Sequence, residues 1–310
     1  MDKISIIVPC FNEEDVLPLF YHEVTTCLQE IENTDYEILF INDGSGDHSE
    51  DILKILGKRN PHCFYYSFSR NFGKEAAMYA GLEHATGNYV VIMDADLQHP
   101  PCLLIDMYHA IKDEGYDCCA GKRIDRDGEG KIRNFLSHTF YKIIQKMTPM
   151  DMMDGAGDFR MMSRQMVDAV LEMKESHRYM KGIFSFVGFD TKWIEFHNVK
   201  RVAGTTKWSF RHLFSYAFEG IFSFSAKPIT LAGLIGGFFL LISLILSIYM
   251  IINMLFIHHQ LHYYFPLSCL ILFLSGIQMI FVCILGQYCS SCYFESKQRP
   301  IYIIKDTNKK

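Results

Sequence analysis

The chain has 310 residues, of which 49% are hydrophobic and 21% are charged, and its formal net charge is -5. This length is enough for one sizeable domain and an additional segment. The slightly acidic balance excludes a strongly basic nucleic-acid-binding protein, so we expect no nucleic-acid partner. The ten cysteines are scattered along the chain, which is typical of a reducing compartment.

The first hundred residues predict four strand-loop-helix units. Apolar runs indicate strands at residues 4–8, 36–41 and 63–68 and a fourth that begins at residue 89. Helices are expected from about residue 13 to 32, from 49 to 56 and from 75 to 84, the first capped by Asn12. Units of about 30 residues in this order predict an open α/β sheet that is mostly parallel and Rossmann-like. Ligands of such sheets bind at the carboxyl ends of the strands.

Polar side chains follow each of these strands. Asp43 opens an Asp-Gly-Ser turn that leads into a helix, which is typical of a nucleotide pocket, although a surface turn uses the same residues. No G-x-G-x-x-G follows the first strand, and the P-loop motif G-x-x-x-x-G-K-[ST] is absent from the sequence. Dinucleotide redox chemistry and P-loop phosphoryl transfer are therefore disfavoured.

Two carboxylates one residue apart, Asp94 and Asp96, end the fourth apolar run. Side chains alternate along a strand, so we expect both aspartates on one face, with Gln98 pointing the same way. A hard cation such as Mg²⁺ or Mn²⁺ prefers oxygen ligands and often takes only one or two carboxylates from the protein. The alternative is that one aspartate caps the helix after Pro101 while the other is merely solvated.

Further elements are expected beyond this point. These are a strand at 117–122, a charged loop at 123–131, a helix at 132–147, an active-site loop at 151–158, a strand at 158–162, a helix capped by Ser163 and a hairpin at 186–196.

Residues 228–294 contain no Asp, Glu, Lys or Arg. Two apolar blocks, 229–257 and 265–288, each exceed the roughly 20 residues that cross a bilayer, so they predict two transmembrane helices; a buried core hairpin is the alternative. Lys and Arg flank the pair but are missing from the loop between the blocks, which predicts a multi-pass protein of the cell inner (plasma) membrane with both termini cytoplasmic. Residues 208–227 resemble interfacial amphipathic helices.

Six short motifs occur in order along the chain. They are PCFNEE at 9–14, INDGS at 41–45, SRNFGKEAA at 69–77, DADLQ at 94–98, GDFRMM at 157–162 and RVAGTTKWS at 201–209. Together they closely resemble the GT-A family 2 glycosyltransferases, and among these the polyprenyl-phosphate enzymes related to bactoprenol glucosyltransferase and dolichyl-phosphate mannose synthase. The family has Asp where this chain has Asn42, which leaves the choice between uridine and guanosine open.

The resemblance implies a division of the chain and a set of site residues. The expected parts are a cytoplasmic GT-A catalytic domain at 1–207, interfacial helices at 208–227, two transmembrane helices at 228–292 and a cytoplasmic tail at 293–310. The implied nucleotide-sugar pocket consists of Pro9, Phe11, Glu13, Asp43, Lys74 and Asp94. The implied ligands of Mg²⁺ or Mn²⁺ are Asp94, Asp96 and Gln98, and the implied catalytic residues are Asp158 and Asp96. The acceptor phosphate would be bound by Lys122, Arg123, Arg133 and Ser137, and the diphosphate would be covered by Arg201 and Lys207.

The function that this resemblance implies is inverting transfer of one hexose from a nucleotide-sugar, UDP-glucose or UDP-N-acetylglucosamine, to undecaprenyl phosphate. Transfer at the cytoplasmic membrane face would make a polyprenyl-phosphate sugar for cell-envelope glycan modification, and relatives suggest a homo-oligomer. One alternative is a processive family 2 polysaccharide synthase, although its Q-x-x-R-W motif is missing here. A non-catalytic membrane scaffold is the other.

Overall fold

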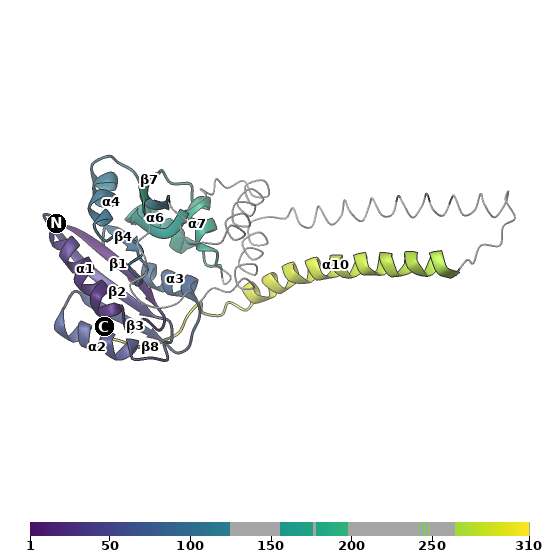
Figure 1. Cartoon of the computed structure of the whole chain (residues 1–310), viewed down its shortest axis with the longest axis horizontal. Helices are drawn as coiled ribbons and strands as arrows, with labels where there is room; N and C mark the ends of the chain where they lie inside the picture. The colour runs from purple at the N-terminus through teal and green to yellow at the C-terminus, as the bar shows by residue number, and fades with distance from the viewer. Residues whose placement is uncertain are drawn as a thin grey trace. The chain divides into compact units, whose positions relative to one another are not determined.

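The computed structural model describes residues 1–124, 156–175, 178–197 and 264–309, together with positions 241, 245 and 248. The chain divides into two compact units, which we describe separately. The first contains the chain up to residue 217 and residues 299–310, and the second contains residues 218–298. Figure 1 shows the sheet of the first unit and the long helix of the second.

An eight-stranded sheet forms the centre of the first unit, with the order β7-β5-β6-β4-β1-β2-β3-β8. Its strands are β1 (Asp2–Cys10), β2 (Thr34–Asn42), β3 (Cys63–Phe68), β4 (Tyr89–Ile92), β5 (Cys118–Arg123), β6 (Ala156–Ser163), β7 (Thr191–Phe196) and β8 (Ile304–Thr307). Strands β1 to β4 are mutually parallel, which confirms the mostly parallel α/β sheet. Strand β6 is antiparallel to both β4 and β5, and β8 is antiparallel to β3.

The direction of winding reverses at β1. The chain passes from β1 to β2 and β3 on one side, and β4 then pairs with β1 on the other side. In open α/β sheets this reversal leaves a crevice outside the carboxyl ends of the two strands that diverge there. The loops after β1 and β4 therefore border the expected ligand site.

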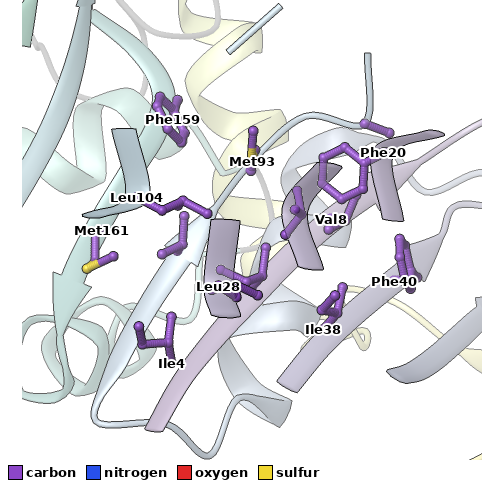
Figure 2. Packing of buried hydrophobic residues seen from close by; sticks show 14 of the residues in the cluster. Ile4, Val8, Phe20, Leu28, Ile38, Phe40, Met93, Leu104, Phe159 and Met161 are labelled. Carbon is purple, nitrogen blue, oxygen red and sulfur yellow. The ribbon is translucent and has the colours of Figure 1, made fainter. Parts of the chain in front are cut away.

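Helices cover both faces of the sheet. Helices α1 (Leu17–Gln29), α2 (Ser49–Arg59) and α4 (Leu103–Lys112) contribute to the hydrophobic core on the face that carries Ile4, Ile6 and Val8 of β1. Figure 2 shows part of this core, with Phe20 and Leu28 of α1 close to Val8 and Ile38. These side chains are almost completely buried, and each buried aliphatic side chain of this kind stabilises the fold by about 1.5–3 kcal/mol.

Helix α3 (Lys74–His84) packs on the opposite face, against β1 and β2. Its approach is close because Gly81 has no side chain: a Cβ atom there would lie 2.1 Å from Cγ2 of Ile7. Helix α6 (Arg164–Glu172) packs beside α3, and α7 (Met180–Phe186) packs on β6. The expected cap of α6 is confirmed, since Ser163 Oγ accepts a hydrogen bond from the Met166 N–H at 3.3 Å.

Two local predictions are wrong. Asn12 does not cap a helix, because α1 begins only at Leu17; Asn12 has a left-handed φ of 53° and accepts a hydrogen bond from the Gly46 N–H at 2.8 Å. The predicted hairpin at 186–196 is absent from the described residues, since residue 186 ends α7 and β7 runs parallel to β5. A short apolar run such as 180–187 fits a buried helix as well as a strand, so its period does not distinguish them.

Residues 299–309 belong to the sheet unit, whereas the sequence suggested a tail at 293–310. Strand β8 completes the edge of the sheet beside β3, and two further contacts fix the segment: the Tyr65 N–H donates to Asn308 Oδ1 at 2.8 Å, and Lys309 Nζ donates to Glu37 Oε2 at 3.0 Å. An unpaired strand edge exposes hydrogen-bonding groups, and β8 satisfies those of β3.

Helix α10 (Tyr264–Ser296) is the described helix of the second unit. Among the described residues, no helix has both the length and the apolarity of a bilayer span. The predicted span at 229–257, apart from positions 241, 245 and 248, and the predicted interfacial helices at 208–227 lie outside the described residues. The two transmembrane helices therefore stay a prediction.

Candidate active site

Three charged side chains from separate segments meet at the carboxyl end of the sheet. Lys74 is the first residue of α3, Asp94 lies two residues after β4, and Asp158 is in β6. Lys74 Nζ lies 2.7 Å from Asp94 Oδ1 and 2.8 Å from Asp158 Oδ2. Their side chains are 33%, 30% and 15% exposed respectively, so each of them is only partly accessible to solvent. We call these residues the Lys74 cluster.

The charges within the Lys74 cluster stabilise one another. Burial alone would raise the pKa of Asp158, but the positive charges of Lys74, Lys181 and Arg160 outweigh it and hold that pKa well below its ordinary value. Burial alone would lower the pKa of Lys74, yet Asp158 and Asp94 raise it above its ordinary value. The Lys74 ammonium and the Asp158 carboxylate are consequently ionised at neutral pH.

Asp158 has a different partner from the one its neighbours in sequence suggest. A purely structural role would be to cap Arg160, but the Arg160 guanidinium donates to the Gly157 carbonyl at 3.1 Å and lies 3.9 Å from the Phe184 ring centroid. Asp158 Oδ2 accepts from Lys74, while its buried Oδ1 has no hydrogen-bond partner in the described part of the chain. A buried acceptor without a partner is costly and is a common property of ligand sites.

The aspartate pair lies on a loop and not on a strand, because β4 ends at Ile92. The expectation that strand alternation places both aspartates on one face is therefore wrong. The Gln98 N–H donates to Asp96 Oδ1 at 3.1 Å, and Leu97 between them has a left-handed φ of 55°. A non-glycine residue in this conformation is strained by about 1–3 kcal/mol, and such strain is common at ligand sites.

Asp94 and Asp96 fit a divalent cation whose coordination is shared with a substrate. No cluster of three or more His, Cys, Asp and Glu side chains suitable for a metal occurs among the described residues. Two carboxylates and the Gln98 amide are hard oxygen donors, which suit Mg²⁺ or Mn²⁺ when phosphate oxygens and water complete the shell. The protein side of such a site is therefore present, although Asp94 also contacts Lys74.

Asp43 fixes the loop that leads to Lys74. Its carboxylate is only 4% exposed and accepts hydrogen bonds from the N–H groups of Phe72 at 2.6 Å and Gly73 at 3.0 Å. Burial raises the pKa of Asp43, and these two hydrogen bonds offset part of that rise. The sequence also predicted that Asp43 contacts the nucleobase, and this role stays a prediction.

Hydrogen bonds from backbone N–H groups to serine side chains join the loop after β1 to the segment after β2. The Asn12 N–H donates to Ser45 Oγ and the Glu13 N–H to Ser49 Oγ, both at 2.9 Å. Pro9, Phe11 and Glu13 of the predicted nucleoside pocket are half-buried along this edge. Lys74, which the resemblance assigns to the same pocket together with Asp94, contacts Asp94 and also Asp158.

The predicted acceptor-phosphate residues are only partly described. Lys122 of β5 forms an exposed ion pair with Glu195 of β7, with 2.9 Å between Nζ and Oε1, and Arg123 ends β5. Arg133, Ser137, Arg201 and Lys207 lie outside the described residues. Their roles stay predictions.

Two residues near the cluster were not singled out from the sequence. His99 stacks on Phe159, the residue after Asp158, with ring centroids 4.8 Å apart. Lys181 of α7 lowers the pKa of Asp158 through its charge. His99 directly follows the DADLQ motif, which could have drawn attention to it, whereas no local pattern indicates that Lys181 approaches a residue of β6.

Comparisons with known proteins identify relatives of this chain. The model of the family described as "Glycosyl transferase family 2" matches residues 5–171. A putative glycosyltransferase, CsbB, of Bacillus subtilis (strain 168) is 43% identical over 305 residues, covering 98% of this chain and 92% of that protein. The bactoprenol glucosyl transferase of Shigella phage SfV is 41% identical over 311 residues, covering 99% and 100%.

The fold also resembles a solved structure. The crystal structure of a mycobacterial protein aligns with a TM-score of 0.50 and 16% sequence identity, covering 71% of this chain and 73% of that one. At this identity the likeness concerns the fold alone.

Proposed function

Since the chain belongs to glycosyl transferase family 2, we propose that it transfers a single glucose from UDP-glucose to undecaprenyl (bactoprenyl) phosphate. Relatives named bactoprenol glucosyl transferase, about as long as this chain, support the donor sugar and the acceptor. The observation that carries the proposal is the Lys74 cluster at the reversal point of the sheet, next to the Asp94–Gln98 loop. UDP-N-acetylglucosamine is the alternative donor.

The Lys74 cluster suits transfer to a phosphate better than transfer to a hydroxyl. The nucleophile is an anionic phosphate oxygen, which attacks the anomeric carbon without first losing a proton. Asp158 has a depressed pKa, so it remains a carboxylate and is a weak proton acceptor. It would therefore act by orienting the sugar and by stabilising the positive charge that develops on the sugar ring during inversion.

A divalent cation completes the donor site in this proposal. Asp94, Asp96 and Gln98 would hold Mg²⁺ or Mn²⁺, which neutralises charge on the departing diphosphate. Lys74 adds a second positive charge on the same side as Asp94. These residues would bind the donor and keep its diphosphate in place while Asp158 orients the sugar.

The acceptor implies a membrane location. A lipid phosphate lies at the headgroup level of the bilayer, so cationic residues close to the membrane must bind it. We propose that the helices expected at 229–257 and 265–288 anchor the chain at the cytoplasmic face of the plasma membrane, as a homo-oligomer. A binding site for the lipid phosphate must be cationic and close to the bilayer. The basic segments that contain Arg133 and Arg201 are the candidates for it.

A donor panel tests the proposed reaction. Purified full-length protein in nanodiscs with undecaprenyl phosphate is given labelled UDP-glucose, UDP-N-acetylglucosamine or GDP-mannose, with Mn²⁺ or with EDTA. We expect transfer from UDP-glucose with Mn²⁺ and none with EDTA. A preference for GDP-mannose would contradict UDP-glucose as the donor, and full activity in EDTA would contradict dependence on a divalent cation.

The same assay separates the two alternatives. A processive synthase would attach several sugars to one acceptor, whereas we expect one hexose per lipid. A scaffold would bind the nucleotide-sugar without turnover. The acidic Asp94–Gln98 loop favours an enzyme over a scaffold, and so does the buried Oδ1 of Asp158, which has no hydrogen-bond partner among the described residues.

A further inference from the structure

Three aromatic rings from three separate segments meet beside the Lys74 cluster. The His99 ring stacks on Phe159 with centroids 4.8 Å apart and 15° between the planes. Phe196 meets both rings at their edges, at 5.6 Å and 70° from His99 and at 6.2 Å and 85° from Phe159. Stacked and edge-to-face pairs of this kind attract one another beyond the effect of the area that they bury. We call the three rings the aromatic bracket.

The backbone of β5 prevents the aromatic bracket from shifting. Gly121 lies against it, and a Cβ atom there would be 2.8 Å from Phe196 Cε1 and 2.9 Å from Phe159 Cδ1. Phe159 is fully buried and Phe196 is 6% exposed. Because the two phenyl rings have no space toward β5, they form a rigid support for His99.

The aromatic bracket connects the two parts of the candidate site, which are Asp158 in β6 and the Asp94–Gln98 loop. Phe159 directly follows Asp158 in β6, and His99 directly follows Gln98 at the end of the acidic loop. That loop leaves the sheet after the hydrogen bond from the Met93 N–H to the Ile7 carbonyl, at 3.0 Å. The position of the loop relative to Asp158 therefore depends on side-chain contacts, of which the His99–Phe159 stack is one.

The Asp94–Gln98 loop also contains a strained backbone conformation, which needs contacts with the surrounding structure to persist. Leu97, two residues before His99, has a left-handed φ of 55°. A non-glycine residue persists in that conformation only where its surroundings over-determine it. The stack of His99 on Phe159 supplies such a constraint at the end of the strained turn.

We propose that His99 is a positioning residue, whose stack on Phe159 sets the Asp94–Gln98 loop at a fixed distance from Asp158. The inference rests on the proposed function, because it assigns the loop to the donor diphosphate and its cation and Asp158 to the sugar. A displacement of about 1 Å between reacting groups lowers a rate by about 10²-fold. His99 thereby affects transfer without contacting either substrate.

A matched pair of substitutions separates stacking from hydrogen bonding. His99 Nδ1 is buried and has no hydrogen-bond partner in the part of the chain that the structure describes, so a phenyl ring loses no bond from that atom. His99→Phe keeps the stack, and His99→Ala removes it. We expect His99→Ala to lower kcat by about 10²-fold with an unchanged KM for undecaprenyl phosphate, and His99→Phe to stay within about threefold of the unsubstituted chain.

Binding supplies the readout that a merely structural role would not change. Mn²⁺ binding in the presence of UDP is measured by electron paramagnetic resonance, without turnover, and thermal unfolding is followed for each variant. We expect His99→Ala to weaken Mn²⁺ binding several-fold and His99→Phe to retain it. A lowered melting temperature with unaltered Mn²⁺ binding in His99→Ala, or an equal loss in both variants, would overturn the inference.

A second variant covers the case in which His99→Ala does not fold. Gly121→Ala keeps all three rings, but its added Cβ would lie 2.8 Å from Phe196 and 2.9 Å from Phe159, so the two phenyl rings must shift. We expect kcat to fall several-fold, and an unchanged kcat would overturn the inference. If the unsubstituted chain bound no Mn²⁺ in the presence of UDP, the proposed function itself would be wrong. If it bound Mn²⁺ but His99→Ala bound it equally well, only the role proposed for His99 would be wrong.

Discussion

At the scale of single residues, Lys74 is the residue on which the candidate site depends. Its ammonium is shared by Asp94 and Asp158, which are 64 residues apart in the sequence. Removal of one partner from such a group leaves a partly buried charge without compensation, which costs more than the pair itself contributes. Substitutions in the Lys74 cluster therefore need isosteric replacements and matched controls.

Asp158→Asn keeps the shape of the side chain and removes its negative charge. We expect kcat to fall by about 10²-fold or more, because charge stabilisation at the sugar is lost, while the donor dissociation constant changes little. Steady-state kinetics and donor titration measure the two effects. Asp168→Asn is the matched control, since Asp168 is an exposed residue of α6 paired with Arg164; near-normal transfer by Asp158→Asn would remove Asp158 from the site.

Lys74→Met tests the electrostatic coupling within the cluster. Asp158 has a depressed pKa, and its ionised form prevails until the pH falls through that value; loss of the Lys74 charge raises this pKa. We therefore expect the acidic limb of the kcat profile to move to higher pH, together with a lower maximum. Lys54→Met is the control, because Lys54 of α2 pairs with Glu50 and Asp306 outside the cluster. An acidic limb at the same pH in both variants would show that Asp158 titrates independently of Lys74.

The sequence predicted which residue types form the site but not how they pair. Asp94, Asp96, Lys74 and Asp158 all belong to motifs, and the structure brings Lys74, Asp94 and Asp158 into contact. The contact between Lys74 and Asp158 depends on β6 entering the sheet next to β4. No local pattern encodes a long-range packing choice of this kind. The same applies to Asp43, whose hydrogen bonds to the 72–73 backbone depend on the approach of another loop.

At the scale of elements, the C-terminal strand is held by a buried carboxylate. Glu37 of β2 is 1% exposed and accepts hydrogen bonds from Ser5 Oγ and the Thr86 N–H, both at 2.7 Å, and from Lys309 Nζ at 3.0 Å. Burial alone would raise its pKa, but these hydrogen bonds outweigh burial and lower the pKa of Glu37 to about 2. The segment after α10 is thereby joined to the second strand of the sheet.

The depressed pKa of Glu37 predicts a pH dependence of stability. The ordinary pKa of 4.5 falls to about 2 on folding, so the stabilisation is present above pH 4.5 and is lost as the pH falls toward 2. A difference of about 2.5 pKa units corresponds to about 3 kcal/mol. We expect Glu37→Gln to lower the free energy of unfolding in urea at pH 7 by up to this amount, and by less at pH 3. An equal loss at both pH values would contradict the linkage.

Tyr302 provides a second contact between the C-terminal segment and the rest of the sheet unit. Its ring stacks on Phe68 with centroids 5.1 Å apart, and its hydroxyl donates to Glu83 Oε2 at 2.5 Å. We expect Tyr302→Ala to destabilise the sheet unit by about 3 kcal/mol, and Tyr302→Phe, which keeps the ring, by about 1 kcal/mol. Urea unfolding of both variants measures the difference. Equal losses would mean that the hydroxyl and not the stack holds the segment.

Local patterns predicted most helices and strands but not every boundary. The strand at Cys63–Phe68 was predicted to the residue, because an apolar run there ends at a polar loop. Strand β8 was missed, because its residues Ile304–Thr307 look like part of a polar tail until β3 offers an edge for pairing. Edge strands of this kind depend on tertiary context more than on propensity.

At the scale of the whole molecule, the four strand-loop-helix units were enough to predict a mostly parallel sheet. The order of the strands was not predictable in the same way, since the insertion of antiparallel β6 between β4 and β5 depends on packing between distant segments. Two apolar blocks in the remaining sequence still predict membrane helices, and the acceptor that we propose requires a membrane surface.

The most direct test of the proposed function is the structure of the product. Full-length protein in nanodiscs that contain undecaprenyl phosphate is incubated with UDP-glucose and Mn²⁺, and the lipid fraction is analysed by mass spectrometry and by NMR of the anomeric proton. We predict one hexose per lipid phosphate in the β configuration, formed at similar rates by the unsubstituted chain and by Asp168→Asn and at least about 10²-fold more slowly by Asp158→Asn. Free glucose without a glycolipid, several hexoses on one lipid, or an α linkage would contradict transfer of a single glucose with inversion.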